Sequence, residues 1–359
     1  MESEILSVIR RFFPDFDENT PVKCYGNGHI NDTYLVQTGE GYILQRVNSA
    51  VFPHPLEVME NIIAVTEHLQ KKIGLAGGDP RRETLNVVNT ADGENCVVMP
   101  NGDVFRMYLF IDAVSYDAPK FPGQMYSAAA AFGRFQKMLD DFPADTLHEV
   151  IPAFHDTPAR YEKLEEAIRA DLAGRASGVQ DEIDFARSLR DRISVVRDRM
   201  ASGKIPLRVT INDTKFNNVL FDRVTDDFVA VIDLDTVMPG SALYDFGDAL
   251  RFGASTAAED ETDLSRVIFD TEIYTTFARG YLSEMGDVLT EDERELLPFS
   301  ALLLTYECGI RFLTDYLNGD TYFKIAHPTH NLDRARNQFA LVRDIDRKLP
   351  ELCEFTARI

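Results

Sequence analysis

The first third of the chain alternates apolar and polar positions in short runs, a pattern typical of β-strands. Two such runs, 33–37 and 42–47, are joined by the turn residues Gly39-Glu40-Gly41. Apolar residues then recur at helical spacing over 55–71, which predicts a helix there. Further strands are expected at 85–88, 95–99 and 104–110. The pattern therefore predicts a small β-rich unit at the start of the chain.

Helical spacing dominates the rest of the sequence. It predicts helices over 124–140, 158–172, 179–201, 261–284, 291–318 and 331–348. One β-like island, 207–235, lies inside this helical part. The stretch IDAVSYDAPKFPG, residues 111–123, breaks both patterns with prolines and small polar residues. We therefore expect an α+β chain with a β-rich lobe over 1–110, a hinge or linker over 111–123, and a large helical lobe over 124–359.

Composition agrees with a soluble chain of more than one core. At 359 residues the chain exceeds the length of roughly 150 residues that one domain usually has. It has no apolar run near the ~18 residues of a membrane span, so no membrane partner is expected. The opening residues MESEILSVIRRFF carry acids before any apolar run, which is the wrong order for a secretory signal. A cytoplasmic monomer or weak homodimer is expected, with four scattered cysteines in no metal or disulfide pattern.

The charge balance limits the partners. With 59 acidic and 37 basic residues the formal net charge is −22, and no basic run forms a stripe that could neutralise a nucleic-acid backbone. Nucleic acid is therefore not an expected partner. A small polyanionic substrate would need a few placed cations or a divalent metal to offset the negative field of the protein.

Polar residues interrupt the β island in the segment LRVTINDTKFNNVLFD, residues 207–222. Such groups are costly to bury unless they are hydrogen-bonded or bind a ligand. Asp213 is followed by Lys215 at +2 and Asn218 at +5, the spacing of a kinase catalytic loop. This spacing lets the aspartate face an attacking hydroxyl while the asparagine reaches a magnesium ion. The alternative is a hairpin loop with solvated polar residues.

A second acidic motif follows the next apolar run. FVAVIDLDTVMPG ends in Asp233 and Asp235, and a carboxylate at the end of a buried strand needs a cation, for which magnesium is the natural choice. Asp235 is expected to bind a second metal or to orient water. The triplet Asp245-Phe246-Gly247 also occurs in protein kinases, but it lies 32 residues after Asp213 and follows no apolar strand. We interpret Asp245 as an anchor of the catalytic loop and not as a metal ligand.

These motifs resemble those of the aminoglycoside phosphotransferase and choline kinase superfamily, whose H-x-D-x-x-x-x-N and I-D patterns match Asn212-Asp213, Asn218 and Ile232-Asp233. The resemblance is closer to the N-acetylhexosamine 1-kinases. It rests on the segments YGNGHINDTYLV, YILQRVNSAVFPHP, NDTKFNNVLFD and IDLDTVMPGSALYDFGDALR. One departure is Ile211, where the family has a histidine that supports the loop.

The resemblance implies a bilobal kinase-like fold that uses ATP and Mg²⁺. Asp213 would orient and deprotonate the 1-hydroxyl of a GlcNAc- or GalNAc-type sugar. Lys215 would offset the charge of the moving phosphoryl group, and Asn218 and Asp233 would hold magnesium. The products would be the sugar 1-phosphate and ADP.

The β-rich lobe is expected to bind ATP. Gly26 and Gly28 allow a close approach of backbone N–H groups to phosphates. The family places a cation in the next strand, where this chain has Gln45-Arg46. Since Leu44 and Arg46 share one face of a strand, we expect Leu44 over adenine and Arg46 at the phosphates. The remaining expected contacts are His29 at the phosphates, Glu60 as the acidic partner of the cation with Glu57 second, and the hinge backbone from Leu109 to Ile111.

Substrate residues are expected in the helical lobe. His155, in the FHD segment, and Arg311, Tyr316 and Tyr322 supply the charges, hydroxyls and flat faces that sugars bind. Glu307, Arg311 and Asp315 recur at four-residue intervals, which is also the pattern of a surface ion-pair stripe.

Two alternatives stay open at this point. The same motifs serve kinases of choline, homoserine or aminoglycosides, for which an acidic, aromatic-lined pocket would be expected. Ile211 and the absent strand lysine also fit a kinase-like binding protein without catalysis.

Overall fold

The computed structural model describes residues 2–26 and 30–359, and these form two compact units. The first unit comprises Met1–Ser115, Asp141–Ile151 and Asn218–Met238. The second comprises Tyr116–Asp140, Pro152–Asn217 and Pro239–Ile359. Each is described below by itself.

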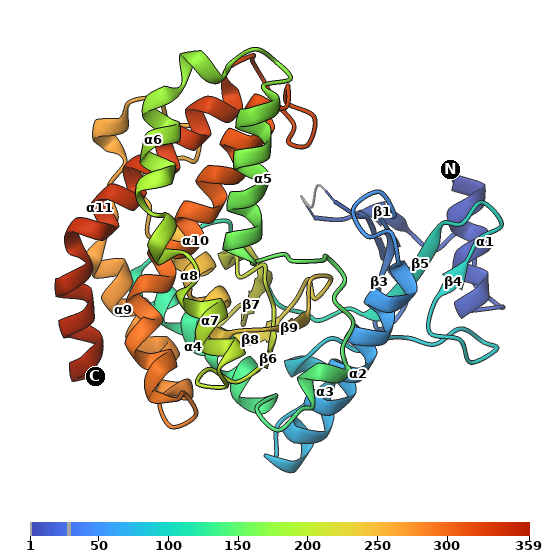
Figure 1. The fold of residues 1–359 in the computed structure, drawn as a ribbon. Helices are drawn as coiled ribbons and strands as arrows, with labels where there is room; N and C mark the ends of the chain where they lie inside the picture. Colours follow the sequence, from blue (N-terminus) through green and yellow to red (C-terminus); the bar gives the residue numbers. More distant parts are fainter. Residues whose placement is uncertain (1, 27–29) are drawn as a thin grey trace. The chain divides into compact units, whose positions relative to one another are not determined.

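An antiparallel five-stranded sheet is the centre of the first unit (Figure 1), in the order β1-β2-β3-β5-β4. Its strands are β1 (Val22–Cys24), β2 (Asp32–Val36), β3 (Tyr42–Val47), β4 (Val97–Val98) and β5 (Val104–Leu109). In the β3–β5 pair, Leu44 lies opposite Met107, Gln45 opposite Arg106 and Arg46 opposite Phe105. Successive side chains of a strand point to opposite faces, so Leu44 and Gln45 mark the two faces of this sheet.

Helix α1 (Glu2–Phe12) covers one face of the sheet. Its apolar residues Ile5, Val8, Ile9 and Phe12 follow helical spacing and pack into one buried cluster with Val36, Leu44, Phe105 and Met107. The unit also contains α2 (Pro55–Leu75), α3 (Pro80–Glu83) and the pair β7 (Val219–Phe221) and β8 (Phe228–Val231).

The second unit is mainly helical (Figure 1). Its α-helices are α4 (Pro122–Met138), α5 (Thr157–Ala170), α6 (Gln180–Ser188), α7 (Val195–Ala201), α8 (Ala242–Gly253), α9 (Thr271–Met285), α10 (Glu291–Leu317) and α11 (His330–Arg358). Helix α10 packs against α5, α8 and α11, and α4 packs against α9. Strand β6 (Arg208–Thr210) pairs with β9 (Met238–Gly240).

Among the described residues, α10 alone has the length and apolar composition to cross a membrane. In the structure 89% of its apolar window is buried inside the protein. An apolar helix that is buried in this way is the central helix of a core.

The predicted fold class is confirmed, whereas several element boundaries differ. The predicted helix 179–201 is two helices, α6 ending at Ser188 and α7 beginning at Val195, with a 3₁₀ turn over Arg190–Arg192 between them. The predicted helix 261–284 begins only at Thr271, after the N-cap Asp270. The predicted strand 85–88 contributes one isolated bridge, Val87 to Tyr108. The domain limits at 110 and 124 stay predictions.

Candidate active site

The predicted catalytic loop leaves β6 and enters a 3₁₀ turn, Phe216–Asn218. Asn212 has a left-handed backbone (φ 60°), and its side-chain amide donates to Thr210 Oγ1 at 2.8 Å. This turn reverses the chain directly before Asp213. Asp213 keeps 26% of its side chain exposed, and its carboxylate lies 2.9 Å from Lys215 Nζ. The two predicted catalytic side chains therefore lie together.

Asp245, in the first turn of α8, holds this loop through its carboxylate. One carboxylate oxygen accepts from Ile211 N at 2.9 Å and Gln136 Nε2 at 2.6 Å, and the other accepts from Asn212 N at 2.7 Å. Burial raises the pKa of Asp245 to about 6, against the opposing effect of these hydrogen bonds. The anchor role predicted for Asp245 is confirmed, because its carboxylate binds the backbone amides of Ile211 and Asn212.

The two residues after Asp245 are also structural. Phe246 is fully buried and packs edge-on against the rings of Phe277 and Tyr281. Gly247 lies where α8 meets α10, and a Cβ there would be 2.4 Å from Ser300 O. The triplet thus combines a loop anchor, a core aromatic and a close helix contact.

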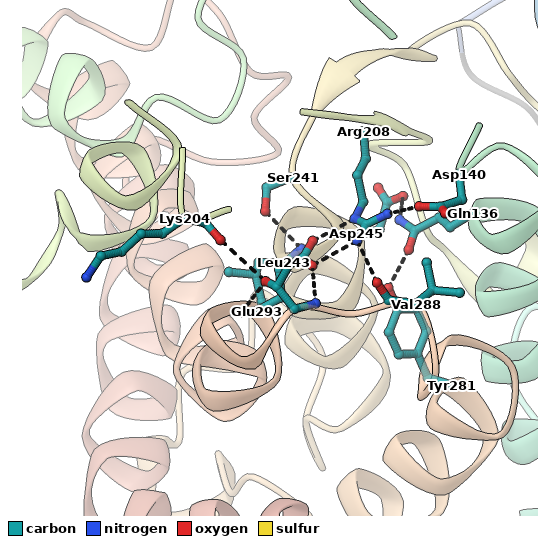
Figure 2. Close-up of polar contacts among 11 residues, drawn as sticks. Gln136, Asp140, Lys204, Arg208, Ser241, Leu243, Asp245, Tyr281, Val288 and Glu293 are labelled. Carbon is teal, nitrogen blue, oxygen red and sulfur yellow. Dashed lines mark hydrogen bonds and ion pairs between the residues drawn. The ribbon is translucent and has the colours of Figure 1, made fainter. Parts of the chain in front are cut away.

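A buried ion pair fixes the strand that enters the loop (Figure 2). Arg208 of β6 donates to both carboxylate oxygens of Glu293, at 2.6 and 2.9 Å, and to Val288 O at 3.0 Å. Glu293 also completes the capping box of α10 with Thr290. A two-pronged guanidinium contact defines orientation as well as distance.

In the first unit, Asn218 and Asp233 lie at matching ends of β7 and β8. Ile232 N donates to Asn218 O at 2.9 Å, which places the two predicted metal ligands on adjacent strands. Asp233 has a left-handed backbone (φ 60°), a conformation that an aspartate adopts at a cost. Among the described residues no three His, Cys, Asp or Glu side chains gather as a metal cage. One amide and one carboxylate nevertheless suit Mg²⁺, which keeps waters and takes further ligands from phosphates.

Asp235 is engaged by other donors. Its buried carboxylate forms an ion pair with Arg106, and its second oxygen accepts from Asn31 Nδ2 at 2.7 Å. A metal bound at Asp235 would have to replace these contacts.

The residues predicted around ATP are packed or paired within the first unit. Leu44 is fully buried beneath α1, and Arg46 on the same face pairs with Asp32 and Asp103. Glu60 pairs with His148 at 2.6 Å. This arrangement does not favour the roles predicted for Leu44, Arg46 and Glu60, which stay predictions.

The glycine loop and the hinge are described in part. Gly26 has φ 77°, a conformation that favours glycine, whereas Gly28 and His29 lie outside the described residues. In the predicted hinge, Leu109 N donates to Asn86 O and Phe110 N to Gly41 O. These two donors are therefore used inside the protein, and Ile111 is buried beside them.

The predicted substrate residue His155 lies against α10. Its Nδ1 is 2.9 Å from Glu307 Oε1, and Thr157 donates to Glu307 Oε2 at 2.7 Å. His155 Nε2 is buried and has no hydrogen-bond partner among the residues that the structure describes. The positive charge that His155 can carry, together with Arg311, holds the pKa of Glu307 below its ordinary value although burial opposes this. Glu307 and Asp315 are both buried, so the alternative of a surface ion-pair stripe is wrong.

Arg311 lies beside aromatic rings and a second arginine. Its guanidinium is 5.6 Å from the ring centroids of both Phe154 and Phe323. Burial and the charge of Arg311 lower the pKa of Arg160. Tyr322 also acts electrostatically on Arg160, in the opposite direction. The structure therefore brings Arg311 and Tyr322 into one neighbourhood with Arg160, a residue that the sequence did not single out. Tyr316 packs under the guanidinium of Arg175, 4.4 Å from its carbon.

Asp248 interacts electrostatically with both His155 and Lys215. It is buried, yet Arg251, His155 and Lys215 together hold its pKa below the ordinary value. In the sequence, Asp248 follows Asp245 by three residues, a spacing that places both side chains on one side of a helix. This pattern could have drawn attention to Asp248 as a residue near the loop anchor.

The fold and the anchored Asp213 loop define a small-molecule phosphotransferase. Residues 22–291 match the family model described as "Phosphotransferase enzyme family", and the chain belongs to this family. Members transfer phosphoryl groups from ATP with a divalent metal.

Solved structures share the fold at low identity. An aminoglycoside phosphotransferase from Alicyclobacillus acidocaldarius has a TM-score of 0.65 at 13% identity, covering 99% of this chain and 96% of that one. A microcompartment-associated aminopropanol kinase has a TM-score of 0.60 at 16% identity, covering 98% of both. The amicoumacin kinase hAmiN, in complex with AMP-PNP and Ca²⁺, has a TM-score of 0.61 at 15% identity, covering 94% and 93%.

Proposed function

We propose that this phosphotransferase is a sugar 1-kinase that transfers the γ-phosphoryl group of ATP to the anomeric hydroxyl of N-acetylhexosamines such as GlcNAc and GalNAc. The observation that carries the proposal is the loop of Asp213, which a buried carboxylate holds through two consecutive backbone amides. A rigid loop supports catalysis because phosphoryl transfer depends mainly on the positioning of the reacting groups.

Asp213 aligns the 1-hydroxyl and accepts its proton. Lys215, 2.9 Å from the Asp213 carboxylate, neutralises charge on the transferred group.

Asn218 and Asp233 would hold the divalent metal, which supplies charge neutralisation at the β- and γ-phosphates. Asn218 directly precedes β7 and Asp233 lies two residues after β8, so the antiparallel pairing of these strands brings both residues to the same end of the hairpin. We propose magnesium because one carboxylate and one amide leave coordination positions for water and phosphate oxygens.

The acceptor pocket would form around His155, Arg311 and Tyr322. His155 Nε2 is a buried polar atom without a partner in the described part of the chain, and a sugar hydroxyl would satisfy it. Arg311 and Tyr322 add hydrogen-bond donors beside the apolar faces of Phe154 and Phe323. Tyr316, which packs under Arg175, is the weakest member of the predicted set.

Charge favours a neutral sugar over a cationic amine. Arg160 and Arg311 lie close enough for one guanidinium to lower the pKa of the other. A choline, aminoalcohol or aminoglycoside cation would be repelled by this pair, whereas hydroxyl and N-acetyl oxygens would accept its hydrogen bonds. Because the carboxylates of Glu307 and Asp156 also act on Arg160, the amine-kinase alternative stays open and is tested by the same acceptor screen as the proposal.

The test is an acceptor screen with Mg²⁺ and ATP, read as ADP release. GlcNAc and GalNAc should be turned over, and phosphorus–proton coupling in NMR should place the new phosphate on C1. The matched control is the methyl glycoside of GlcNAc, which lacks a free 1-hydroxyl and should be inert. Faster turnover of choline, ethanolamine or an aminoglycoside would contradict the proposal. Thermal stabilisation by ATP without turnover of any acceptor would instead favour a binding protein.

A further inference from the structure

A buried arginine lies at the centre of a polar network on the sheet face opposite α1. Arg106 of β5 is 1% exposed, and its Nε and Nη2 donate to Gln45 Oε1 at 3.0 and 2.8 Å. Nη2 also bonds Asp235. Gln45 donates in turn to Thr33 Oγ1 at 3.1 Å, so strands β2, β3 and β5 all contribute. The position of the guanidinium is therefore fixed by its neighbours.

One nitrogen of this guanidinium has no partner among the described residues. Arg106 Nη1 is buried and makes no hydrogen bond to any of them, although the other two nitrogens are satisfied. A buried N–H without an acceptor is costly, and native proteins retain such groups mainly where a ligand completes them. An anion is the ligand that a guanidinium binds best.

Acidic side chains surround the guanidinium. Burial opposes the charge of Arg106, yet Asp235 and also Asp233 raise its pKa above the ordinary value. Asn31 Nδ2 donates to Asp235 at 2.7 Å, and Asn31 Oδ1 accepts from Asn48 N at 3.0 Å. The hydrogen-bonded network thus extends from Arg106 through Asp235 to Asn31 and Asn48.

We propose that Arg106 is the cation that binds the phosphates of ATP in this protein, in place of a charged residue at Gln45. Nη1 donates to a phosphate oxygen, and Asp235 positions the guanidinium for this contact. The inference rests on the proposed function only in requiring that the chain binds ATP.

The neutral residue at position 45 of β3 accounts for a phosphate-binding cation that comes from the neighbouring strand β5. Gln45 and Arg106 are directly opposite in the β3–β5 register, so their side chains lie on the same face of the sheet. A neutral amide at position 45 cannot pair with a phosphate, but its oxygen accepts two bonds from Arg106. Arg46 is on the opposite face and is paired with Asp32 and Asp103.

The experiment compares ATP with adenosine, which lacks phosphates, on the full chain by calorimetry without any acceptor. Arg106→Gln should weaken ATP binding by about 10- to 100-fold, the order expected for a charged hydrogen bond, and leave adenosine binding within twofold. The matched surface control is Arg10→Gln, whose partner Glu18 is exposed, and it should change neither affinity.

Two further variants separate phosphate binding from a structural role. Arg106→Gln/Asp235→Asn removes both buried charges, so it should recover melting temperature but not ATP affinity. Gln45→Lys/Arg106→Gln moves the cation across the strand pair and should recover at least part of the ATP affinity.

Equal weakening of ATP and adenosine in all Arg106 variants would overturn the inference, and so would a larger ATP-specific loss in Arg46→Gln. Wild-type protein that binds adenosine and ATP equally would also overturn it. If wild type binds neither nucleotide, the proposed function itself fails.

Discussion

Asp315→Asn tests whether the loop that carries Tyr322 belongs to the acceptor site. Asp315 is buried in the last turn of α10. One carboxylate oxygen accepts from Thr321 N at 2.9 Å and Tyr322 N at 2.8 Å. The other accepts from Phe323 N and Asn331 Nδ2, both at 2.9 Å. An asparagine has only one acceptor oxygen, so in either orientation its NH₂ group faces two donors.

The magnitude follows from the two lost bonds. At about 1 to 1.5 kcal/mol each, in a loop that water partly reaches, the ordered loop loses about 2 to 3 kcal/mol. Because about 1.4 kcal/mol is a factor of ten, the acceptor KM can rise at most about 30- to 150-fold. We expect an increase of about five- to 100-fold with KM for ATP unchanged, since the affected amides belong to the substrate loop.

Steady-state kinetics and hydrogen exchange of residues 321–323 check this prediction. The matched control is Asp270→Asn. A single oxygen of Asp270 accepts from both Glu272 N and Ile273 N, so an asparagine can keep both bonds. This control should leave kinetics and exchange unchanged. Faster exchange at 321–323 with an unaltered acceptor KM would refute the placement of Tyr322 in the acceptor site.

Two further predictions concern Asp233 and Asp245. Asp233→Asn should abolish magnesium-dependent turnover with little change in melting temperature. Asp245→Ala should lower the free energy of unfolding by about 2 to 4 kcal/mol, because it leaves three buried donors without an acceptor. The reverse pattern in activity and melting temperature would show that the wrong aspartate has been assigned to the metal. Because the folded pKa of Asp245 is raised to about 6 from an ordinary value of 3.8, its protonated form favours folding below about pH 4 and that contribution is lost as the pH rises through 6. The unfolding free energy of wild type relative to Asp245→Asn should therefore fall by about 2 to 3 kcal/mol between pH 4 and pH 7 in denaturant titrations, and a flat difference would exclude the buried carboxylate as the cause.

Local sequence patterns were sufficient for most helices and for the anchor role of Asp245. Asp213 and Lys215 are two residues apart, so their contact depends only on the local turn, while their catalytic roles stay predictions. Asp245 could be separated from the proposed metal ligands because no apolar strand precedes it. The apolar repeat over 291–318 predicted α10, but its charged residues at four-residue spacing left its burial open.

Contacts set by strand register could not be read from the sequence. Arg106 and Asp235 are 129 positions apart, and Gln45 meets Arg106 only through the β3–β5 pairing. The period of two correctly placed Leu44 and Arg46 on one face, but it could not show that α1 covers that face. Helix α1 itself has a regular apolar spacing, so that signal was available and was missed.

Side chains that anchor loops through backbone amides could not be recognised from the sequence either. Asp315 appeared as one member of a charged ladder on a helix, and the sequence gave no sign that its carboxylate turns toward backbone amides beyond the helix end. Backbone donors are the same for every residue, so a side chain that binds them leaves no complementary residue to recognise.

The central claim is that Asp213 is the general base for transfer to a sugar 1-hydroxyl, and Asp213→Asn tests it most directly. The asparagine keeps the shape of the side chain but removes the charge and the proton acceptor. With GlcNAc as acceptor, kcat should fall by about 10²- to 10⁴-fold while calorimetry shows ATP affinity within about threefold of wild type. An Asp213→Asn enzyme with kcat within about tenfold of wild type would contradict the account, because a positioned general base contributes more than that.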